Sequence, residues 1–477
     1  MNVTHLPEDG TNFIPYEVMG KIISFNDSEL MFDASKKERD YEVVIDICQD
    51  YTGGLVMGAS SGERYVAQLV IPAREYTETE SANPEYDPEA EEGTESPTIT
   101  TREPVPFDID NCELRLWEME VYEMPNFDDL KLAVEALSGG KNTVLLDDRE
   151  MPSIMVLFPR FNISDVIDGG SQNVHPGFSV NGAVKDMYVS KFQNIVLNDR
   201  AYSLALKDPK TYVNFDQAVT YCRNKGTGWG LLPYSLWSAI ALWCRKNETM
   251  PRGNNNWGKD ISYPHERGVP TSYETSGDHD GEPARCATGS GPDTWNHNWL
   301  PDGIADLNGN VWEWCAGMRT QAGELQIIPY ANCMMADISM AAGSSEWKAI
   351  KSDGTLVTPG TADTLKWDWV SSKIQLTNGT ITYTTDQGNG CQYKDMTLVS
   401  GLSAAPELAK ALLLYPDEPG GDYGGDYHYV NTVGERLPIC GGRWSGASSA
   451  GVFHVYLGHP RSGSNGTLGF RSAFCEL

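Results

Sequence analysis

The sequence has few basic residues for its length. Its 477 residues include 36 Lys and Arg against 66 Asp and Glu, which gives a net charge of −30 at pH 7. Binding to nucleic acid needs a basic face that pairs with phosphate groups, and docking on anionic lipid needs one too. The charge therefore predicts a protein that binds no nucleic acid and does not dock on acidic membranes.

Long hydrophobic runs are also absent. The first residues contain neither a basic stretch nor an apolar one, so we expect no signal peptide. The longest apolar stretches, such as residues 239–244, are far shorter than the ~20 residues of a membrane-spanning helix. We therefore expect synthesis in a cytoplasm and no insertion into a membrane.

The ten cysteines form no pattern that is typical of a metal site. They are scattered along the chain, without a C-x-x-C pair or a Cys/His cluster at zinc spacing. Buried free thiols are the interpretation that we favour over disulfides. Nucleotide-binding and nucleophile-elbow motifs are missing as well, so the sequence indicates none of those enzyme classes.

What the sequence does contain divides it into four parts. Residues 1–75 lack a helical period and predict a small β-rich domain, with strands at 21–25, 42–47, 55–57 and 64–71. Residues 76–106 predict an acidic linker, because the stretch from Glu78 to Glu95 has eight acidic residues and no basic one.

The remaining two parts contain the predicted helices. Residues 107–165 predict a small α/β module, whose helix begins at an Asn126 cap and ends at Gly139. Residues 166–477 are rich in Gly, Trp and Asn, with helices expected after Asn214, after Pro233 and near 406–414. The predicted fold class is α+β, with a loop-dominated C-terminal domain.

Two segments carry a resemblance to a known family. The first is ADLNGNVWEWC at 305–315, and the second combines GGRW at 441–444 with GFRS at 469–472. Together they resemble the formylglycine-generating enzymes, whose domain is a variant of the C-type lectin fold. The resemblance covers roughly residues 180–477 and implies that this part is a C-type lectin-like domain.

The resemblance does not carry the enzyme's activity with it. Family enzymes hold copper with two close cysteines between the GG-W and GFR blocks, a thiolate pair that suits copper(I). No cysteine lies within 441–474 here, and Cys440 and Cys475 only flank that segment. We therefore expect no catalysis and no required cofactor, with a copper-dependent oxidase as the alternative.

The family also implies a candidate structural calcium site. The residues that match its calcium-binding loop are Asp306, Gly309, Val311 and Glu313. Carboxylates and backbone carbonyls in a tight loop suit a hard cation. The alternative is that the Asp306 and Glu313 side chains only form hydrogen bonds to loop amides.

The segment at 441–471 also resembles the variable region of proteins diversified by retroelements, such as phage tropism determinants. In that family, mutagenic reverse transcription rewrites adenines, and the AAY codons can never become Lys, Glu, Gln, Met or Trp. None of these five residues occurs from Ser445 to Gly466. The resemblance implies a ligand-binding face that is exchanged while its framework is kept.

Alternation along the predicted strand at 453–458 separates these two roles. It directs Phe453, Val455 and Leu457 towards the scaffold and the residues between them towards the displayed face. The predicted binding residues are Arg443, Ser445, Gly446, His454, Tyr456, Gly458, His459, Pro460, Gly463, Gly466 and Thr467. By the resemblance, the framework residues are Trp444, Arg461, Ser462, Gly469, Phe470 and Arg471, and Arg471 is expected to donate hydrogen bonds to loop carbonyls.

These observations predict a receptor-binding display protein of a phage or prophage tail. The N-terminal domain would attach to tail or particle proteins, and the variable face would bind an unknown host-surface protein or glycan. We expect a location in the virion after cytoplasmic synthesis, with a purely cytoplasmic protein as the alternative. A homo-oligomer, such as a trimer, is a further expectation, and a bacterial ligand-binding protein of the same fold is the other alternative function.

Overall fold

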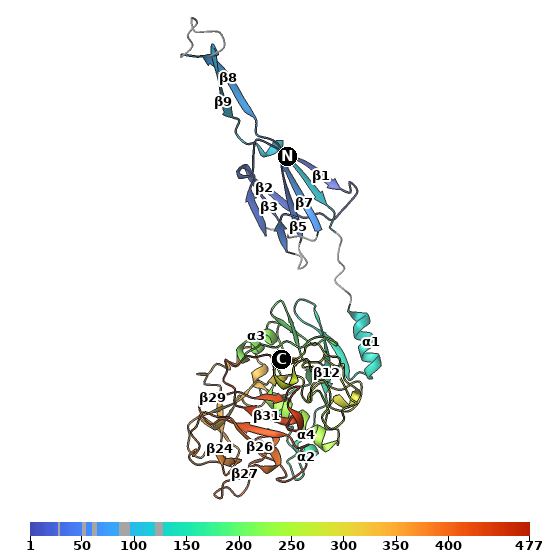
Figure 1. Cartoon of the computed structure of the whole chain (residues 1–477), viewed down its shortest axis with the longest axis vertical. Coiled ribbons are helices and arrows are strands. Elements are labelled where there is room, and N and C mark those ends of the chain that lie inside the picture. The colour runs from blue at the N-terminus through green and yellow to red at the C-terminus, as the bar shows by residue number, and fades with distance from the viewer. Residues whose placement is uncertain (27–28, 50–53, 60–63, 85–95, 120–126) are drawn as a thin grey trace. The chain divides into compact units, whose positions relative to one another are not determined.

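A computed structural model describes residues 1–26, 29–49, 54–59, 64–84, 96–119 and 127–477. The chain divides into unit 1, residues 1–126, and unit 2, residues 127–477 (Figure 1). Both units are rich in strands, so the protein is a mixed α+β structure with few helices and many small sheets. None of the described helices has the length and apolar character needed to cross a membrane.

Unit 1 is built on a five-stranded sheet in the order β1-β10-β7-β5-β6. Its strands are β1 (Asn2–Leu6), β10 (Glu113–Trp117), β7 (Arg64–Ile71), β5 (Val43–Gln49) and β6 (Leu55–Met57). A second sheet contains β2 (Tyr16–Met19), β3 (Ile22–Phe25) and β4 (Leu30–Asp33). The core between them is aliphatic and aromatic, with side chains such as Ile23, Phe25, Ile47, Leu69 and Leu114 fully buried.

The predicted acidic linker takes a different form. Strands β8 (Tyr76–Ala82) and β9 (Thr98–Pro104) pair along their whole length, and Figure 1 shows them as a ribbon extending from the sheet of unit 1. The centre of the acidic stretch, residues 85–95, lies outside the described residues. The chain leaves the sheet of unit 1 after β7 and returns to the same sheet through β10. The segment 76–106 is therefore a hairpin insertion within unit 1 and not a linker between two domains.

The predicted module at 107–165 does not exist as one body. Strand β10 pairs with β1 and β7 and so belongs to unit 1. Helix α1 (Asp128–Ser138) and strands β11 (Asn142–Leu146) and β12 (Pro152–Phe158) belong to unit 2, where β12 pairs with β15 (Met187–Ser190). The predicted Asn126 cap lies outside the described residues, whereas Gly139 ends the helix at a φ of +61° as predicted.

Unit 2 contains three larger sheets. The first has the order β11-β12-β15-β33-β18, with β33 at Ser472–Phe474 and β18 at Trp229–Leu231. The second has the order β26-β28-β31-β30-β19-β32. Its strands are β26 (Asn389–Gln392), β28 (Tyr427–Val430), β31 (Gly451–Leu457), β30 (Ile439–Gly441), β19 (Trp312–Trp314) and β32 (Leu468–Phe470).

The third sheet is formed by the long segment between the two family motifs. Its main path is β23-β22-β21-β24-β25-β27, and β20 and β29 pair at its side. The strands are β20 (Met318–Gln321), β21 (Glu324–Ile327), β22 (Lys348–Ile350), β23 (Leu356–Val357), β24 (Lys366–Val370), β25 (Lys373–Thr377), β27 (Thr397–Leu398) and β29 (Glu435–Arg436). Two small hairpins pair β13 (Ser179–Val180) with β14 (Ala183–Val184), and β16 (Ile195–Leu197) with β17 (Arg200–Tyr202).

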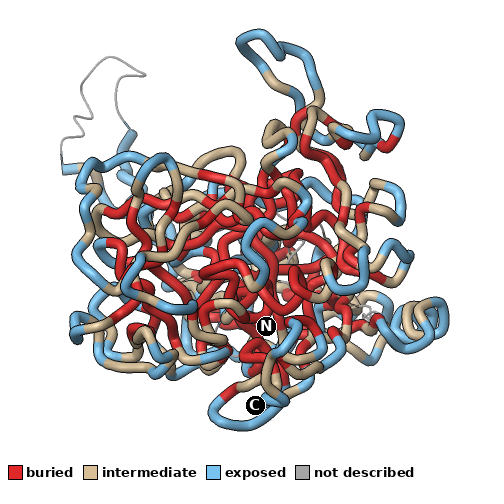
Figure 2. Tube along the Cα trace, turned by 90° about the horizontal axis from the view of Figure 1, so that it is seen from below, coloured by how far each residue is buried: buried red, intermediate tan, exposed pale blue. Residues whose placement is uncertain are grey.

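The helices of unit 2 follow the sequence signals closely. Helix α3 (Phe215–Arg223) begins with a capping box in which Asn214 and Gln217 bond each other's backbone, and α4 (Tyr234–Lys246) begins after Pro233. The short helices α2 (Ile163–Val166) and α5 (Glu407–Ala411) complete the set. Most of α4 is fully buried, and the buried residues gather inside the surrounding exposed loops (Figure 2). All ten cysteines are buried and unpaired, as expected.

Candidate functional site

The predicted variable segment lies in the middle of the second sheet of unit 2. Strand β31 pairs antiparallel with β30 and parallel with β28, while β32 pairs parallel with β19. The turn between β30 and the segment uses two glycines, Gly441 and Gly442, which have φ values of +88° and +91°. A side chain at Gly441 would also approach the carbonyl oxygen of Leu307 to 2.9 Å, so the GG pair of the motif is required by the backbone.

The alternation predicted for β31 is only partly reproduced in the side chains. Phe453, Val455 and Leu457 are fully buried, which confirms the scaffold face. Tyr456 is half-buried on the opposite face, but His454 is only 2% exposed because framework rings cover it. The Trp312 ring contacts the imidazole edge-on at 4.5 Å between centroids, and the Tyr429 ring stacks on it at 5.6 Å.

Seven of the predicted binding residues line one cavity of about 440 Å³. They are Arg443, Ser445, Gly446, His454, Tyr456, His459 and Thr467. A volume of this size is typical of small-molecule and cofactor sites. Residues that are up to 24 positions apart in the chain are therefore brought together around one hollow.

The other four predicted residues lie beside the cavity without lining it. At Gly458 an added Cβ would approach the Tyr456 ring to 2.3 Å, so this glycine leaves room for the tyrosine. Gly463 donates its backbone N–H to the carbonyl of Pro460 in a turn next to His459. Gly466 lies against the hydroxyl of Tyr212. These positions shape the segment that carries the cavity residues.

Five further residues line the cavity that the sequence prediction missed: Trp312, Tyr429, Ile439, Ser449 and Asn465. Trp312 belongs to the NGNVWEW motif, in strand β19. Tyr429 lies in β28, where residues 427–430 (YHYV) alternate in the same way as β31, with His428 and Val430 buried. The alternation of residues 427–430 is a local signal that could have predicted a second strand with one exposed face. Nothing in the sequence indicates that this strand, β28, pairs with β31.

Burial keeps the imidazole of His454 uncharged. Desolvation holds the pKa of His454 well below its ordinary value, with a smaller contribution from His428. Neither ring nitrogen has a hydrogen-bond partner among the described residues, and both are shielded from solvent. Burial also lowers the pKa of His459, so the cavity has one permanently charged group, the exposed guanidinium of Arg443.

Framework side chains hold the rim of the cavity. The indole N–H of Trp444 donates to a carboxylate oxygen of Glu274 at 2.7 Å. Arg461 pairs with Glu435 at 3.0 Å and with Asp216 at 2.7 Å, and it donates to the carbonyl of Met340. Both residues were predicted as framework, and these contacts tie the segment to α3, to β29 and to two loops of unit 2.

The residues of the candidate calcium site do not suit a cation. The side-chain amide nitrogen of Gln193 donates to the carbonyl oxygens of Asp306 (3.2 Å) and Val311 (3.0 Å) and to the Glu313 carboxylate (3.1 Å). Asn310 fixes this orientation by donating to the Gln193 carbonyl oxygen at 2.8 Å. A neutral donor therefore occupies the position between the oxygens that a calcium ion would need.

The charge of Glu313 is also already neutralised. Its two carboxylate oxygens accept hydrogen bonds from Arg471 at 2.5 and 2.6 Å, in a bidentate pair that is fully buried. Arg471 also donates to the carbonyls of Ser190 and Ala305, which confirms the predicted hydrogen bonds to loop carbonyls. Gly309 allows the loop to turn, because its φ of +79° favours glycine and its Cα lies close to the backbone of Asn254.

Asp306 is a buried carboxyl in the same loop. It accepts a hydrogen bond from the backbone N–H of Gly289 at 2.7 Å. Burial nevertheless raises its pKa to about 6, because the desolvation of the charged form outweighs this hydrogen bond and the attraction of Arg471.

The two cysteines that flank the segment, Cys440 and Cys475, do not form a pair. Cys440 lies in β30, whereas Cys475 follows β33 in a different sheet, and both are fully buried. Burial raises the pKa of the Cys475 thiol to about 11, which disfavours the thiolate that copper(I) needs. Within the described residues, no group of three or more His, Cys, Asp or Glu side chains could hold a metal ion.

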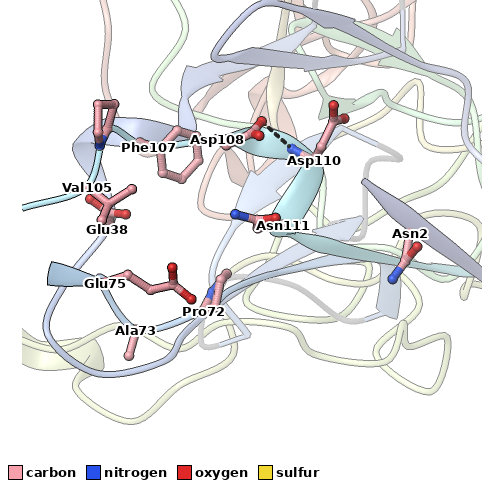
Figure 3. A pocket seen from close by; sticks show the side chains of 11 residues that line it. Asn2, Glu38, Pro72, Ala73, Glu75, Val105, Phe107, Asp108, Asp110 and Asn111 are labelled. Carbon is pink, nitrogen blue, oxygen red and sulfur yellow. Dashed lines mark hydrogen bonds between the residues drawn. The ribbon is translucent and has the colours of Figure 1, made fainter. Parts of the chain in front are cut away.

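Unit 1 contains a second hollow of about 400 Å³ that is lined by acidic side chains (Figure 3). Asp110 pairs there with the amino terminus at 2.9 Å, and Glu38 pairs with Arg74 at 3.0 Å. Asp108 accepts a hydrogen bond from the backbone N–H of Asp110 (Figure 3). Three of the four acidic side chains thus already bond donors of the protein itself, so we assign no ligand to this hollow.

Comparisons with known proteins add little to this geometry. No protein-family model matches the chain, and no curated protein matches its sequence. Among solved structures, Treponema denticola variable protein 1 matches with 12% identity over 70% of this chain and 98% of that chain. The TM-score of 0.23 is too low for this likeness to support a fold or a function. The functional interpretation therefore depends on the site itself.

Proposed function

We propose that this chain is a non-catalytic, ligand-binding display protein. Its binding face is the cavity of unit 2, which is formed by a segment of exchangeable residues on a fixed framework. The observation that carries the proposal is that seven residues, chosen only as exchangeable positions in the sequence, line one cavity. The framework residues beside them make buried or half-buried contacts with distant parts of unit 2.

The proposal assigns each part of the chain a role. Unit 2 is a C-type lectin-like domain, and retroelement mutagenesis diversifies the segment at 441–471. Unit 1 attaches the protein to a phage or prophage tail, in which several copies, such as a trimer, would raise the overall affinity through avidity. The calcium ion of the resembling family is replaced by the Gln193 amide and the Arg471 guanidinium.

A comparison of substitution tolerance tests the central claim. Libraries are made that vary, one position at a time, the seven cavity residues and, as matched controls, the framework residues Trp444, Arg461 and Arg471. We expect most cavity variants to keep the wild-type melting temperature within a few degrees, because changes away from the core usually cost under ~0.5 kcal/mol. His454, which is buried, is the exception. Equal sensitivity of the two sets would contradict the proposal.

The diversification itself has a separate test in the genome that encodes the chain. A reverse transcriptase gene and a near-identical template copy of the 441–471 coding segment should lie close to this gene. In the template, adenines should occur at codons for the cavity residues and be rare at codons for Trp444 and Phe470. If no such template exists, the claim of diversification by a retroelement is wrong, whereas the proposed ligand-binding face is unaffected.

A further inference from the structure

We infer that the ligand bound by this cavity contains a pyranose sugar ring, which stacks against an aromatic wall that lies outside the variable segment. This inference rests on the proposed ligand-binding function and names the chemistry of its ligand. The aromatic wall consists of Trp312 and Tyr429, and the polar wall consists of Arg443, Ser445, Asn465 and Thr467. Each wall restricts the ligand in a different way.

The aromatic wall is a property of the framework. Trp312 comes from β19 and Tyr429 from β28, so exchange of residues within 441–471 leaves both in place. Tyr429 lies directly opposite Tyr456 in the parallel pair of β28 and β31, and their ring centroids are 5.1 Å apart. The Trp312 ring lies 5.9 Å from the Tyr456 ring, so the exchangeable Tyr456 lies between the two constant rings.

The neighbouring strand leaves space for this wall. Gly390 in β26 lies opposite Tyr429, and a Cβ at this position would approach the Tyr429 ring to 2.4 Å. A Cβ at Gly388 would approach the hydroxyl of Tyr456 to 2.9 Å. Glycines at these two positions therefore let both tyrosine rings lie against the sheet, where they present a broad apolar surface to a ligand.

The polar wall offers donors that the protein does not use. Among the described residues, the guanidinium of Arg443, the hydroxyl of Ser445 and the amide nitrogen of Asn465 make no hydrogen bond. The Asn465 carbonyl oxygen, in contrast, accepts the backbone N–H and the hydroxyl of Thr467 at 2.8 and 2.6 Å. A ligand that leaves these donors unpaired in a desolvated cavity would lose free energy.

A pyranose ring satisfies both walls. One of its faces consists of C–H groups, which can lie on Tyr429 or Trp312, and its edge carries hydroxyls for the donors of the polar wall. An aromatic side chain of a protein ligand would cover the aromatic wall but leave most of the donors unpaired. A simple anion would pair with Arg443 and leave the aromatic wall exposed to water. The constant wall thus selects the class of ligand, and the exchangeable wall selects the particular sugar.

A glycan array probed with the full chain tests this inference. Binding to the best array sugar is then measured by calorimetry, with its methyl glycoside as the probe. Tyr429→Ala should weaken binding roughly fivefold, as expected for the loss of one aromatic contact. Tyr429→Phe should keep the affinity, because the ring is retained. Tyr427→Ala is the matched control, since Tyr427 lies half-buried on the same strand outside the cavity, and it should change the affinity less than about twofold.

The outcomes separate this inference from the proposed function. A peptide library rich in Tyr, Trp and Phe is probed in parallel. Peptide binding that Tyr456→Ala abolishes, with no glycan bound, would overturn the sugar assignment and support the display face. Glycan binding that is unchanged in Tyr429→Ala and in the non-aromatic Tyr429→Leu would also overturn it. If neither array binds the chain, the sugar assignment is wrong and the proposed function loses its support too.

Discussion

Units 1 and 2 are held together by different means. In the described part of unit 1, Ser24 is the single buried polar side chain, and the core consists of apolar residues between hydrogen-bonded strands. Unit 2 buries polar and charged groups throughout, including Arg471, Glu313, Gln193 and Asn310. Loops that lack strand partners bond some of their backbone groups to such side chains, as Arg471 and Gln193 do with loop carbonyls. The comparison teaches that unit 2 fixes its loops through buried polar contacts, whereas unit 1 depends on an apolar core between paired strands.

Removing the central charge of this polar interior should have the largest effect. Arg471→Met leaves the Glu313 carboxylate buried without its partner, which should lower the free energy of unfolding by about 3–5 kcal/mol. Urea unfolding followed by tryptophan fluorescence measures it, because every tryptophan except Trp117 lies in unit 2. Arg443→Met is the matched control on an exposed guanidinium of the same segment and should change stability by less than ~0.5 kcal/mol. Equal effects would show that the buried pair is not the centre of the framework.

The second-largest loss of stability is expected from a substitution that creates a cavity in the apolar core of unit 1. Leu69 is fully buried in β7, opposite Ile45 in β5 and Leu114 in β10. Leu69→Ala should destabilise unit 1 by about 2–5 kcal/mol through lost contacts and the space left behind. Hydrogen exchange of peptides that cover β5 and β7 measures this loss. Val44→Ala, on the exposed side of β5, should leave the exchange rates nearly unchanged, and a similar loss for both variants would argue against a single apolar core.

The buried carboxyl of Asp306 should give unit 2 a pH dependence. Its pKa of about 6 lies above the ordinary value of 3.8, so between these values the folded protein keeps a proton that the unfolded chain has released. Stability should therefore fall as the pH rises through this window, by roughly 3 kcal/mol in total. Asp306→Asn cannot titrate, so its stability relative to the wild type should rise from pH 4 to pH 7. A difference that stays constant over this range would disprove the assignment.

The smallest expected change in stability tests the proposal that the Gln193 amide replaces calcium in the candidate site. Melting temperatures of the wild type should be the same with a chelator and with calcium chloride, because the Gln193 amide occupies the site. Gln193→Glu places a carboxylate among three oxygens and should destabilise unit 2 by about 1–3 kcal/mol, and calcium should restore part of this loss. Gln217→Glu, at an exposed capping position that accepts Glu equally well, is the control. A wild-type protein that is stabilised by calcium would contradict the assignment.

Local signals in the sequence predicted the elements that depend on local interactions. The cap at Asn214 and the apolar spacing from Phe215 define α3, and the Val- and Leu-rich run at 64–71 coincides with β7. The pairing of distant segments could not be predicted in this way. Nothing local indicates that β10 pairs with β1, so the boundaries at 106 and 165 were wrong.

The candidate site was predicted to the extent that one segment forms it. Alternation along β31 identified Tyr456 and His454, and the family motif identified Arg443 and Thr467 as neighbours. Tyr429 was missed because its position depends on a parallel pairing between strands 27 residues apart, which no local pattern reveals. The partner of Arg471 was missed for the same reason, since Glu313 lies 158 residues earlier.

The place of β33 in its sheet has a consequence for the order in which the protein is made. This strand, at Ser472–Phe474, lies between β15 and β18, so both neighbours can pair with it only after the ribosome has added residues some 240 to 290 positions further along the chain. Unit 1 has its last strand, β10, by residue 117 and can fold while synthesis continues. Under the proposed function, the exchangeable segment would be translated just before the strands that complete unit 2, at a time when unit 1 can already have folded.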